Sequence, residues 1–244
     1  MATIAILSDI HANVVALDAV LAELDALRPD GVVCLGDVAA TGPAPSQVME
    51  RLEQRDWRIV RGNCDDAMLR FAAGTDEPLD GQHDEIDRWC NEQLSAEQIA
   101  FMATFEPVVA FEAGGVAVCG YHGSPRSNLD EILPGTADSD LTHWLFGQLA
   151  RIYAGGHTHV QMARRYREAL VINPGSVGLP FTETAGGVMV NPFWAEYAVL
   201  HLDGGRTGVE LHRTPVDRAA FEQMVAGSGM PHRGWWSGDW TEIN

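Results

Sequence analysis

Side chains that can bind metal ions follow five short apolar segments along this sequence of 244 residues. The segments span residues 3–7, 32–35, 57–60, 116–119 and 152–154. The side chains that follow them, in chain order, belong to Asp9, His11, Asp37, Asn63, His122, His157 and His159. In open α/β sheets, ligands gather beyond the carboxyl ends of the strands. Strands at these segments would therefore bring all seven side chains together.

These side chains are of the types that hold borderline divalent cations. Imidazole and carboxylate suit Mn²⁺, Fe²⁺, Ni²⁺ and Zn²⁺, a carboxylate can bridge two ions, and Asn adds a neutral oxygen. Two cations about 3.5–4 Å apart lower the pKa of a shared water and neutralise the attacking and leaving oxygens of an in-line displacement. The sequence therefore predicts a dinuclear centre that hydrolyses phosphate esters.

No single one of these motifs is specific. An Asp-x-His motif like that of Asp9 and His11 also occurs by chance in unrelated sequences. A lone His is more often a hydrogen-bonded core residue than a ligand. The prediction rests on the joint order of the motifs. Five successive strand ends that each supply oxygen or imidazole donors have no competitive structural explanation.

The elements that must position these donors begin with βαβ units. The first third of the chain alternates short apolar runs with helical patterns, which predicts right-handed crossovers and a largely parallel sheet. Apolar residues recur at helical spacing over 14–24, and this helix should end near Pro29. Ser46 should cap a second helix that runs to about Arg55.

Later segments predict a second sheet, so the expected fold class is α/β. Residues 108–111 and 116–119 flank a Gly114-Gly115 turn, which is typical of a hairpin. The turn at 203–205 should join a second hairpin. Strand character is also found at 152–154, 170–172, 197–202 and 209–212.

Two segments depart from this regular pattern within an expected single domain over 1–226. Residues 71–106 predict a helical lid insertion, with one helix around 84–93 and another that begins at Ser95, whose capping box Gln98 completes. The tail, 227–244, contains three tryptophans and should pack on the domain. A dimer contact and a wall of the substrate cleft are the alternatives for this tail.

Composition limits the partners. A formal net charge of −18 repels nucleic-acid backbones and anionic membranes, so an anionic substrate needs the help of metal ions. No apolar run is long enough to span a bilayer, and no basic residues precede the first apolar run. The four cysteines show no CxxC pairing, and disulfides are not expected. We expect a cytoplasmic protein that acts on a small phosphate ester.

The chain resembles the calcineurin-like metallophosphoesterase family. The resemblance is carried by SDIHAN, LGDVAATGP, RGNCDD, YHGSP and GGHTH, in that order. It extends to INPGSVGLP at 172–180, which is similar to a segment of the small bacterial and archaeal phosphodiesterase branch. The resemblance implies a two-sheet β-sandwich flanked by helices, in four αββα layers.

The resemblance also implies how the donors are shared between two ions. One ion would be held by Asp9, His11 and His159. The other would be held by Asn63, His122 and His157, and Asp37 would bridge the two. Asp37, Asn63 and His122 would thereby be part of the catalytic centre, with Mn²⁺ as the expected metal.

One position departs from the family pattern. The family commonly has a His directly after the Asn, which assists the leaving group or binds phosphate, and this chain has Cys64 there. The same Cys is frequent in the phosphodiesterase branch, so the change indicates a subtype and leaves the general acid open. Arg126 is a candidate clamp for a phosphate oxygen, with a surface Arg as the alternative. Asp65 is a candidate to orient a ligating His, with a solvated loop carboxylate as the alternative.

Several functions compete for this sequence. A Rossmann module would need a GxGxxG motif after the first strand, where Asp9 and His11 stand instead. A non-catalytic metal-binding scaffold on the same fold would not need the complete set of donors. Among enzymes we favour a phosphodiesterase. A dinucleoside polyphosphate hydrolase and a phosphomonoesterase remain open.

Overall fold

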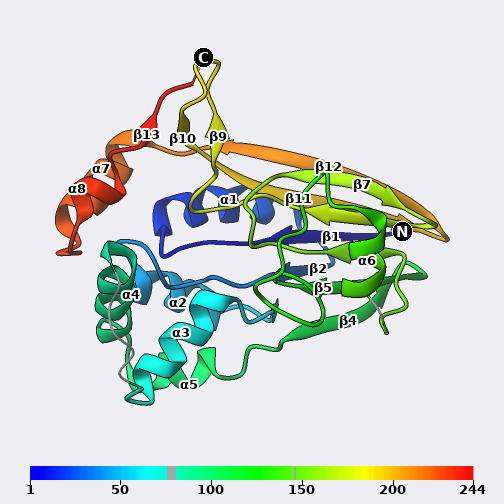
Figure 1. Cartoon of the computed structure of the whole chain (residues 1–244), viewed down its shortest axis with the longest axis horizontal. Helices are drawn as coiled ribbons and strands as arrows, with labels where there is room; N and C mark the ends of the chain where they lie inside the picture. Colours follow the sequence, from blue (N-terminus) through cyan, green and yellow to red (C-terminus); the bar gives the residue numbers. More distant parts are fainter. Residues whose placement is uncertain (76–80, 146, 244) are drawn as a thin grey trace.

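Two five-stranded sheets face each other across an apolar layer in the computed structural model, which describes residues 1–75, 81–145 and 147–243 (Figure 1). The order of strands across the first sheet is β12 (Arg206–Pro215), β11 (Trp194–Asp203), β1 (Ala2–Leu7), β2 (Gly31–Cys34) and β3 (Arg58–Ile59). In this sheet β1, β2 and β3 are parallel, and β11 pairs antiparallel with β1.

The order of strands across the second sheet is β4 (Val108–Ala113), β5 (Val116–Tyr121), β6 (Ile152–Ala154), β8 (Ala169–Asn173) and β7 (Met162–Tyr166). This sheet has a parallel centre and antiparallel edges, because β5, β6 and β8 are parallel and β4 and β7 run against them. A small third sheet lies near the C-terminus (Figure 1). It contains β13 (Trp240–Thr241), β10 (Met189–Pro192) and β9 (Thr182–Glu183).

Strand alternation places the two faces of β1 in two different cores. Ile4 and Ile6 pack in the layer between the sheets, whereas Ala5 and Leu7 face the helices on the outer side. Both faces of β1 are therefore buried, which is why its sequence is almost continuously apolar.

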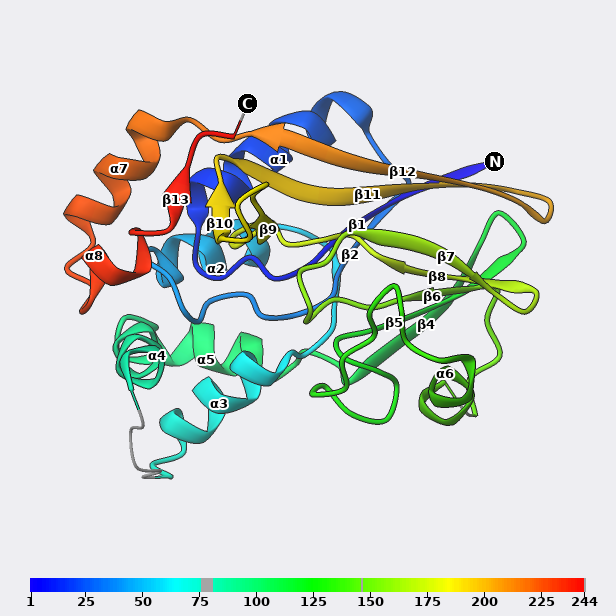
Figure 2. The same ribbon diagram turned by 45° about the horizontal axis from the view of Figure 1, so that its top comes forward.

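Helices cover both outer faces, so the predicted four layers are confirmed (Figure 2). The first sheet is covered by α1 (Val14–Leu27), α2 (Pro45–Glu53) and α7 (Arg218–Gly227). On the other side, α6 (Asp138–Trp144) contributes Leu141 to a cluster with Tyr121 and Tyr153 of the second sheet.

Residues 63–106 form α3 (Asn63–Ala72), α4 (Gln82–Glu92) and α5 (Ala96–Met102). The capping box predicted at Ser95 is confirmed, since its hydroxyl accepts from the Gln98 N–H at 3.2 Å and the Gln98 side chain accepts from the Ser95 N–H at 3.1 Å. Ile86 and Cys90 of α4 are buried in the core beside α2. A lid role stays a prediction, and residues 76–80 of the predicted lid lie outside the described residues.

The predicted cap at Ser46 is wrong. The helix begins one residue earlier, at Pro45, whose fixed φ suits the first turn. The Ser46 hydroxyl instead contacts the Gln98 side chain at 3.3 Å and so connects α2 with α5.

The C-terminal tail contacts its own chain. It contains α8 (Arg233–Trp236) and β13, and the buried rings of Trp236 and Trp240 pack beside Phe221, with 4.3 Å between the ring centroids of Phe221 and Trp240. Trp235 points outward and is 44% exposed. Among the described residues, the helices are too short or too polar to cross a membrane.

Candidate metal centre

The seven predicted donors lie close together beyond the carboxyl ends of strands from both sheets. Donor atoms of Asp9, His11 and His159 lie within 4.8 Å of one another, and so do those of Asp37, His122 and His157. The Asn63 oxygen is 3.0 Å from Nε2 of His122. The fold brings together residues as far apart in the sequence as His11 and His159, which are separated by 148 positions.

The first group directs acceptor atoms at one point. Nε2 of His159 lies 3.2 Å from Nε2 of His11 and 3.2 Å from Oδ1 of Asp9. Nδ1 of His159 donates to the Leu179 carbonyl at 2.7 Å, so the lone pair of the neutral ring is on Nε2. Oδ1 of Asp9 is buried and has no hydrogen-bond partner among the described residues. Converging acceptors of this kind fit a cation.

The second group is built in the same way. Nδ1 of His122 donates to the Leu35 carbonyl at 2.7 Å, and Nε2 faces Oδ2 of Asp37 at 3.3 Å. Oδ2 of Asp37 is also 4.0 Å from Nε2 of His11, which belongs to the first group. Asp37 therefore lies between the two sets of donors.

Burial and charge make the centre selective for positive charge. Burial, reinforced by the charge of His159, lowers the pKa of His11 to about 4. Burial also disfavours the charged form of His122, but the charge of Asp37 outweighs it and raises the pKa of His122 to about 10. In the same way burial raises the pKa of Asp37, while His122 holds that pKa well below its usual range. A buried carboxylate here requires a cationic partner.

The backbone of this centre is unusually strained. Non-glycine residues rarely adopt the left-handed region, and such strain costs about 1–3 kcal/mol per residue and is concentrated at functional sites. Hydrogen bonds from the Asp9 N–H to the Gly36 carbonyl, at 2.9 Å, and from the His11 N–H to the Asp37 carbonyl, at 3.0 Å, hold these turns. The donors with positive φ are Asp9, His11, Asp37, His157 and His159.

Two glycines allow a close approach of the backbone to the donors or to their neighbours. A Cβ on Gly62 would lie 2.0 Å from Oδ1 of Asp37, and a Cβ on Gly156 would lie 1.9 Å from the hydroxyl of Ser8. Any side chain at either position would displace a donor or its support.

The prediction that Asp65 orients a ligating His is wrong, because its carboxylate binds backbone N–H groups instead. Its carboxylate accepts the N–H groups of Asp37 at 2.9 Å, Val38 at 3.0 Å and Gly62 at 2.8 Å. Burial and the charge of Asp37 raise the pKa of Asp65 to about 7. Asp65 thus fixes the loop that presents Asp37.

Cys64 lies inside the centre, whereas the guanidinium of Arg126 is held elsewhere. A potential ligand atom of Cys64 groups with those of His11 and Asp37, and burial together with the charge of Asp37 raises the pKa of its thiol well above the usual range. The guanidinium of Arg126 is bound by Asp130 at 2.7 and 3.1 Å. It would have to leave that carboxylate to clamp a phosphate.

His83 packs edge-on against Trp235, with 4.7 Å between ring centroids. Sequence reasoning also missed Asn173, whose side chain donates to the Gly156 carbonyl at 2.7 Å and supports the turn that carries His157. The INP sequence around Asn173 was the available signal.

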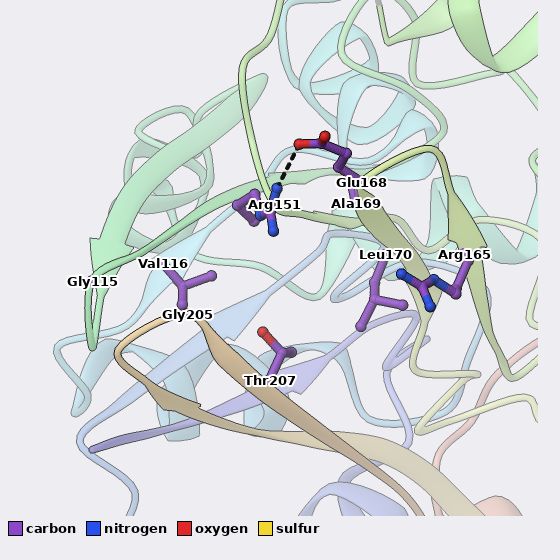
Figure 3. A pocket seen from close by; sticks show the side chains of 9 residues that line it. All are labelled: Gly115, Val116, Arg151, Arg165, Glu168, Ala169, Leu170, Gly205 and Thr207. Carbon is purple, nitrogen blue, oxygen red and sulfur yellow. Dashed lines mark hydrogen bonds and ion pairs between the residues drawn. The ribbon is translucent and has the colours of Figure 1, made fainter.

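A second cavity, of about 340 Å³, lies where β5 and β8 begin and thus at the opposite end of those strands (Figure 3). Arg151 and Arg165 line it, and Arg151 pairs with the exposed Glu168 at 3.0 Å. None of the seven donors lines this cavity.

Comparison with known proteins agrees with the geometry. Residues 2–192 match the family model of the calcineurin-like phosphoesterase superfamily domain. An uncharacterized protein of Methanocaldococcus jannaschii is 26% identical over 197 residues, which is 72% of this chain and 76% of that protein.

Two solved structures are similar over almost the whole chain. A metallophosphoesterase from Sphaerobacter thermophilus is 25% identical with a TM-score of 0.73, covering 98% of this chain and 97% of that one. A hypothetical protein from Pyrococcus horikoshii shares the fold at 17% identity with a TM-score of 0.80, covering 95% of each chain.

Proposed function

Because the chain belongs to the calcineurin-like phosphoesterase superfamily, we propose that it is a dinuclear-metal phosphodiesterase acting on small phosphate esters. The observation that carries the proposal is the convergence of buried carboxylate oxygens and imidazole nitrogens in two neighbouring groups. Oδ1 of Asp9, a buried acceptor with no hydrogen-bond partner among the described residues, lies 3.2 Å from Nε2 of His159. Two divalent cations bound there would activate a water and neutralise the charge on the phosphate.

The ligand sets that we propose follow the two groups of donors. Asp9, His11 and His159 would hold one ion. Asn63, His122 and His157 would hold the other, and the position of Asp37 between the groups supports its role as the bridging ligand. Mn²⁺ is the ion we propose, because the imidazole, carboxylate and amide donors suit it.

The chemistry of Cys64 supports a preference for esters with good leaving groups. An alkoxide must be protonated as it departs, and a positioned acid contributes about 10²–10⁴-fold when one is needed. The raised pKa of Cys64 makes its thiol a poor proton donor. We therefore favour diesters with stable leaving groups over alkyl diesters and alkyl monoesters. Free cysteines at 34, 64, 90 and 119 support the cytoplasm as the compartment.

Metal loading and turnover test the proposal together. Protein loaded with Mn²⁺ should contain about two ions per chain by elemental analysis and should hydrolyse an aryl phosphodiester. Asp37→Asn should lose metal and abolish turnover, because its side chain lies between both groups. His201→Ala is the matched control, since His201 pairs with Glu210 far along the first sheet. The proposal would be overturned if the folded protein held no metal after incubation with Mn²⁺. It would also be overturned if the metal-bound protein hydrolysed no phosphate ester.

A further inference from the structure

The aromatic ring of Phe181 is exposed next to the candidate metal centre. It stacks on the imidazole of His159, with 5.0 Å between the ring centroids and 11° between the planes. Even so, 44% of Phe181 remains exposed. One face of the ring is covered by a candidate ligand, so the opposite face is available to another planar group.

The backbone connects Phe181 rigidly to the centre. The Leu179 carbonyl accepts the Nδ1–H of His159 at 2.7 Å, and the Gly178 N–H donates to the Asp9 carbonyl at 2.9 Å. These bonds lie within three residues of Phe181. The ring is therefore held at a set position relative to the donors.

A second exposed apolar side chain extends this surface. Met189 of β10 pairs with Glu183 of β9, and Glu183 follows Phe181 by two residues. Cross-strand partners share one face of a sheet, so Met189 lies on the same face as Glu183, and Phe181 directly precedes β9. Met189 is 54% exposed. We call this pair the Phe181–Met189 strip.

We propose that Phe181 determines specificity by stacking against an aromatic group of the phosphate ester, with Met189 along the edge of that group. The inference rests on the proposed phosphodiesterase function and names its substrate class as esters that carry an aryl ring or a nucleobase. The exposed Glu183 on the same face of the hairpin opposes a further anionic group. The strip therefore favours a neutral ring over a polyphosphate chain.

The competing explanation is that Phe181 only supports the ring of His159. In that case its removal would weaken metal binding, and all substrates would be affected alike. A role in recognition predicts instead that binding of metal and of small phosphates is retained, while the preference for aromatic groups is lost.

Two phosphonates separate these roles without relying on turnover. Phenylphosphonate and methylphosphonate share the same head group and differ in the ring, and calorimetry on Mn²⁺-loaded protein measures both. Stacking of a planar ring on an aromatic side chain typically changes affinity by about 5- to 100-fold, so the wild type should prefer phenylphosphonate by a ratio in this range.

Phe181→Leu keeps an apolar side chain against His159, and Phe181→Ala removes it. Both variants should bind methylphosphonate and Mn²⁺ as the wild type does, and their preference for phenylphosphonate should fall to about one. Val188→Ala is the matched control, because Val188 is another exposed apolar residue of the same hairpin and should leave the preference unchanged.

The outcomes separate this inference from the proposed function. A wild-type preference that survives in Phe181→Leu overturns the inference, even if the protein hydrolyses diesters. Loss of Mn²⁺ with equal weakening of both phosphonates also overturns it, since Phe181 would then only support His159. A Phe181-dependent preference in a protein that hydrolyses no phosphate ester would sustain the binding site and overturn the enzymatic role.

Discussion

At the scale of single residues, five of the seven donors have a left-handed backbone, although none is glycine. The cost of such strain is offset only where the surrounding structure fixes the conformation, which Asp65 and the carbonyls of neighbouring loops do here. Strain at these residues and the burial of two carboxylates mean that the protein gives up stability in order to hold these atoms in place. Bound cations would restore part of that stability.

Asp65 gives a test of how the bridging position is held. In Asp65→Asn an NH₂ group replaces an acceptor that faces backbone N–H groups, and a buried donor left unpaired costs about 1–3 kcal/mol. Loss of charge alone would relieve repulsion with Asp37, so any damage must come from the missing acceptor. We expect reduced Mn²⁺ content and at least about tenfold slower turnover, by elemental analysis and an aryl diester assay.

The neighbouring Asp66→Asn is the control for Asp65→Asn. Asp66 is half-buried and pairs with Arg61 at 2.9 Å, away from the Asp37 loop. Equal effects of the two substitutions would contradict the role assigned to Asp65.

Cys64 gives a second test at this scale. A thiol titrates near 8.5 and an imidazole near 6.5 in peptides, so the thiol donates a proton less readily at neutral pH. Cys64→Ala should therefore change kcat/KM for an aryl phosphodiester by less than about threefold, whereas Cys64→His should raise kcat/KM on alkyl esters or monoesters. A large loss on the aryl substrate in folded, metal-loaded Cys64→Ala would refute this expectation.

At the scale of elements, α4 and the C-terminal tail both hold the loop that follows Asp37. The indole N–H of Trp236 donates to the Thr41 carbonyl at 2.6 Å, and the Thr41 hydroxyl donates to Asp87 of α4 at 2.8 Å. Thr41 has a φ of 60°, which a β-branched residue rarely adopts. These contacts connect Trp236 of the C-terminal tail to the loop that follows Asp37.

Trp236→Phe tests the connection from the tail. An aromatic ring is retained, but the N–H donor is lost and the smaller ring leaves part of the buried indole space unfilled, so we expect the free energy of unfolding in urea to fall by at least about 1–3 kcal/mol. Trp235→Phe, at an exposed neighbouring position, should change that free energy by less than about 0.5 kcal/mol. Indistinguishable midpoints for the two variants would show that the hydrogen bond does not contribute.

At the scale of the whole molecule, a chain with net charge −18 buries two carboxylates in one centre. Binding of cations to the folded state alone should stabilise it, by about 2.7 kcal/mol per site at a concentration 100 times the dissociation constant. Mn²⁺ should thus raise Tm in calorimetry, and a chelator should reverse the rise.

The same stabilisation should depend on pH with a defined sign. Imidazole must be neutral to bind a metal, and without metal the charge of Asp37 outweighs burial and raises the pKa of His122 to about 10, so protons compete with Mn²⁺ and the rise in Tm should shrink as the pH falls below about 10. His11, whose pKa is lowered by burial to about 4, adds to this competition only in acid. Asp37→Asn should show little rise at any pH. A Tm that does not respond to Mn²⁺ in the wild type would contradict a structural coupling of these ions to the fold.

The sequence alone determined the elements whose burial and turns are encoded locally. Parallel strands β1 and β2, the hairpins β4–β5 and β11–β12, and the Ser95 capping box all follow from periodicity and from Gly or Ser at defined positions. The order of donors after strand ends indicated the family, which the match over residues 2–192 confirms. Short or exposed elements such as α6, β7, β9 and β10 lack a clear pattern and were not predicted.

Only the tertiary structure decided which atoms of residues far apart in the sequence come into contact. The 3.2 Å approach of His11 to His159 depends on how the two sheets pack, and the positive φ values depend on hydrogen bonds from neighbouring loops. The backbone role of Asp65, the hydrogen bond from Trp236 to the Thr41 carbonyl, and the stacking of Phe181 on His159 likewise leave no periodic trace. Periodicity records which side of an element is buried, whereas the partner it meets is set by the packing of the whole chain.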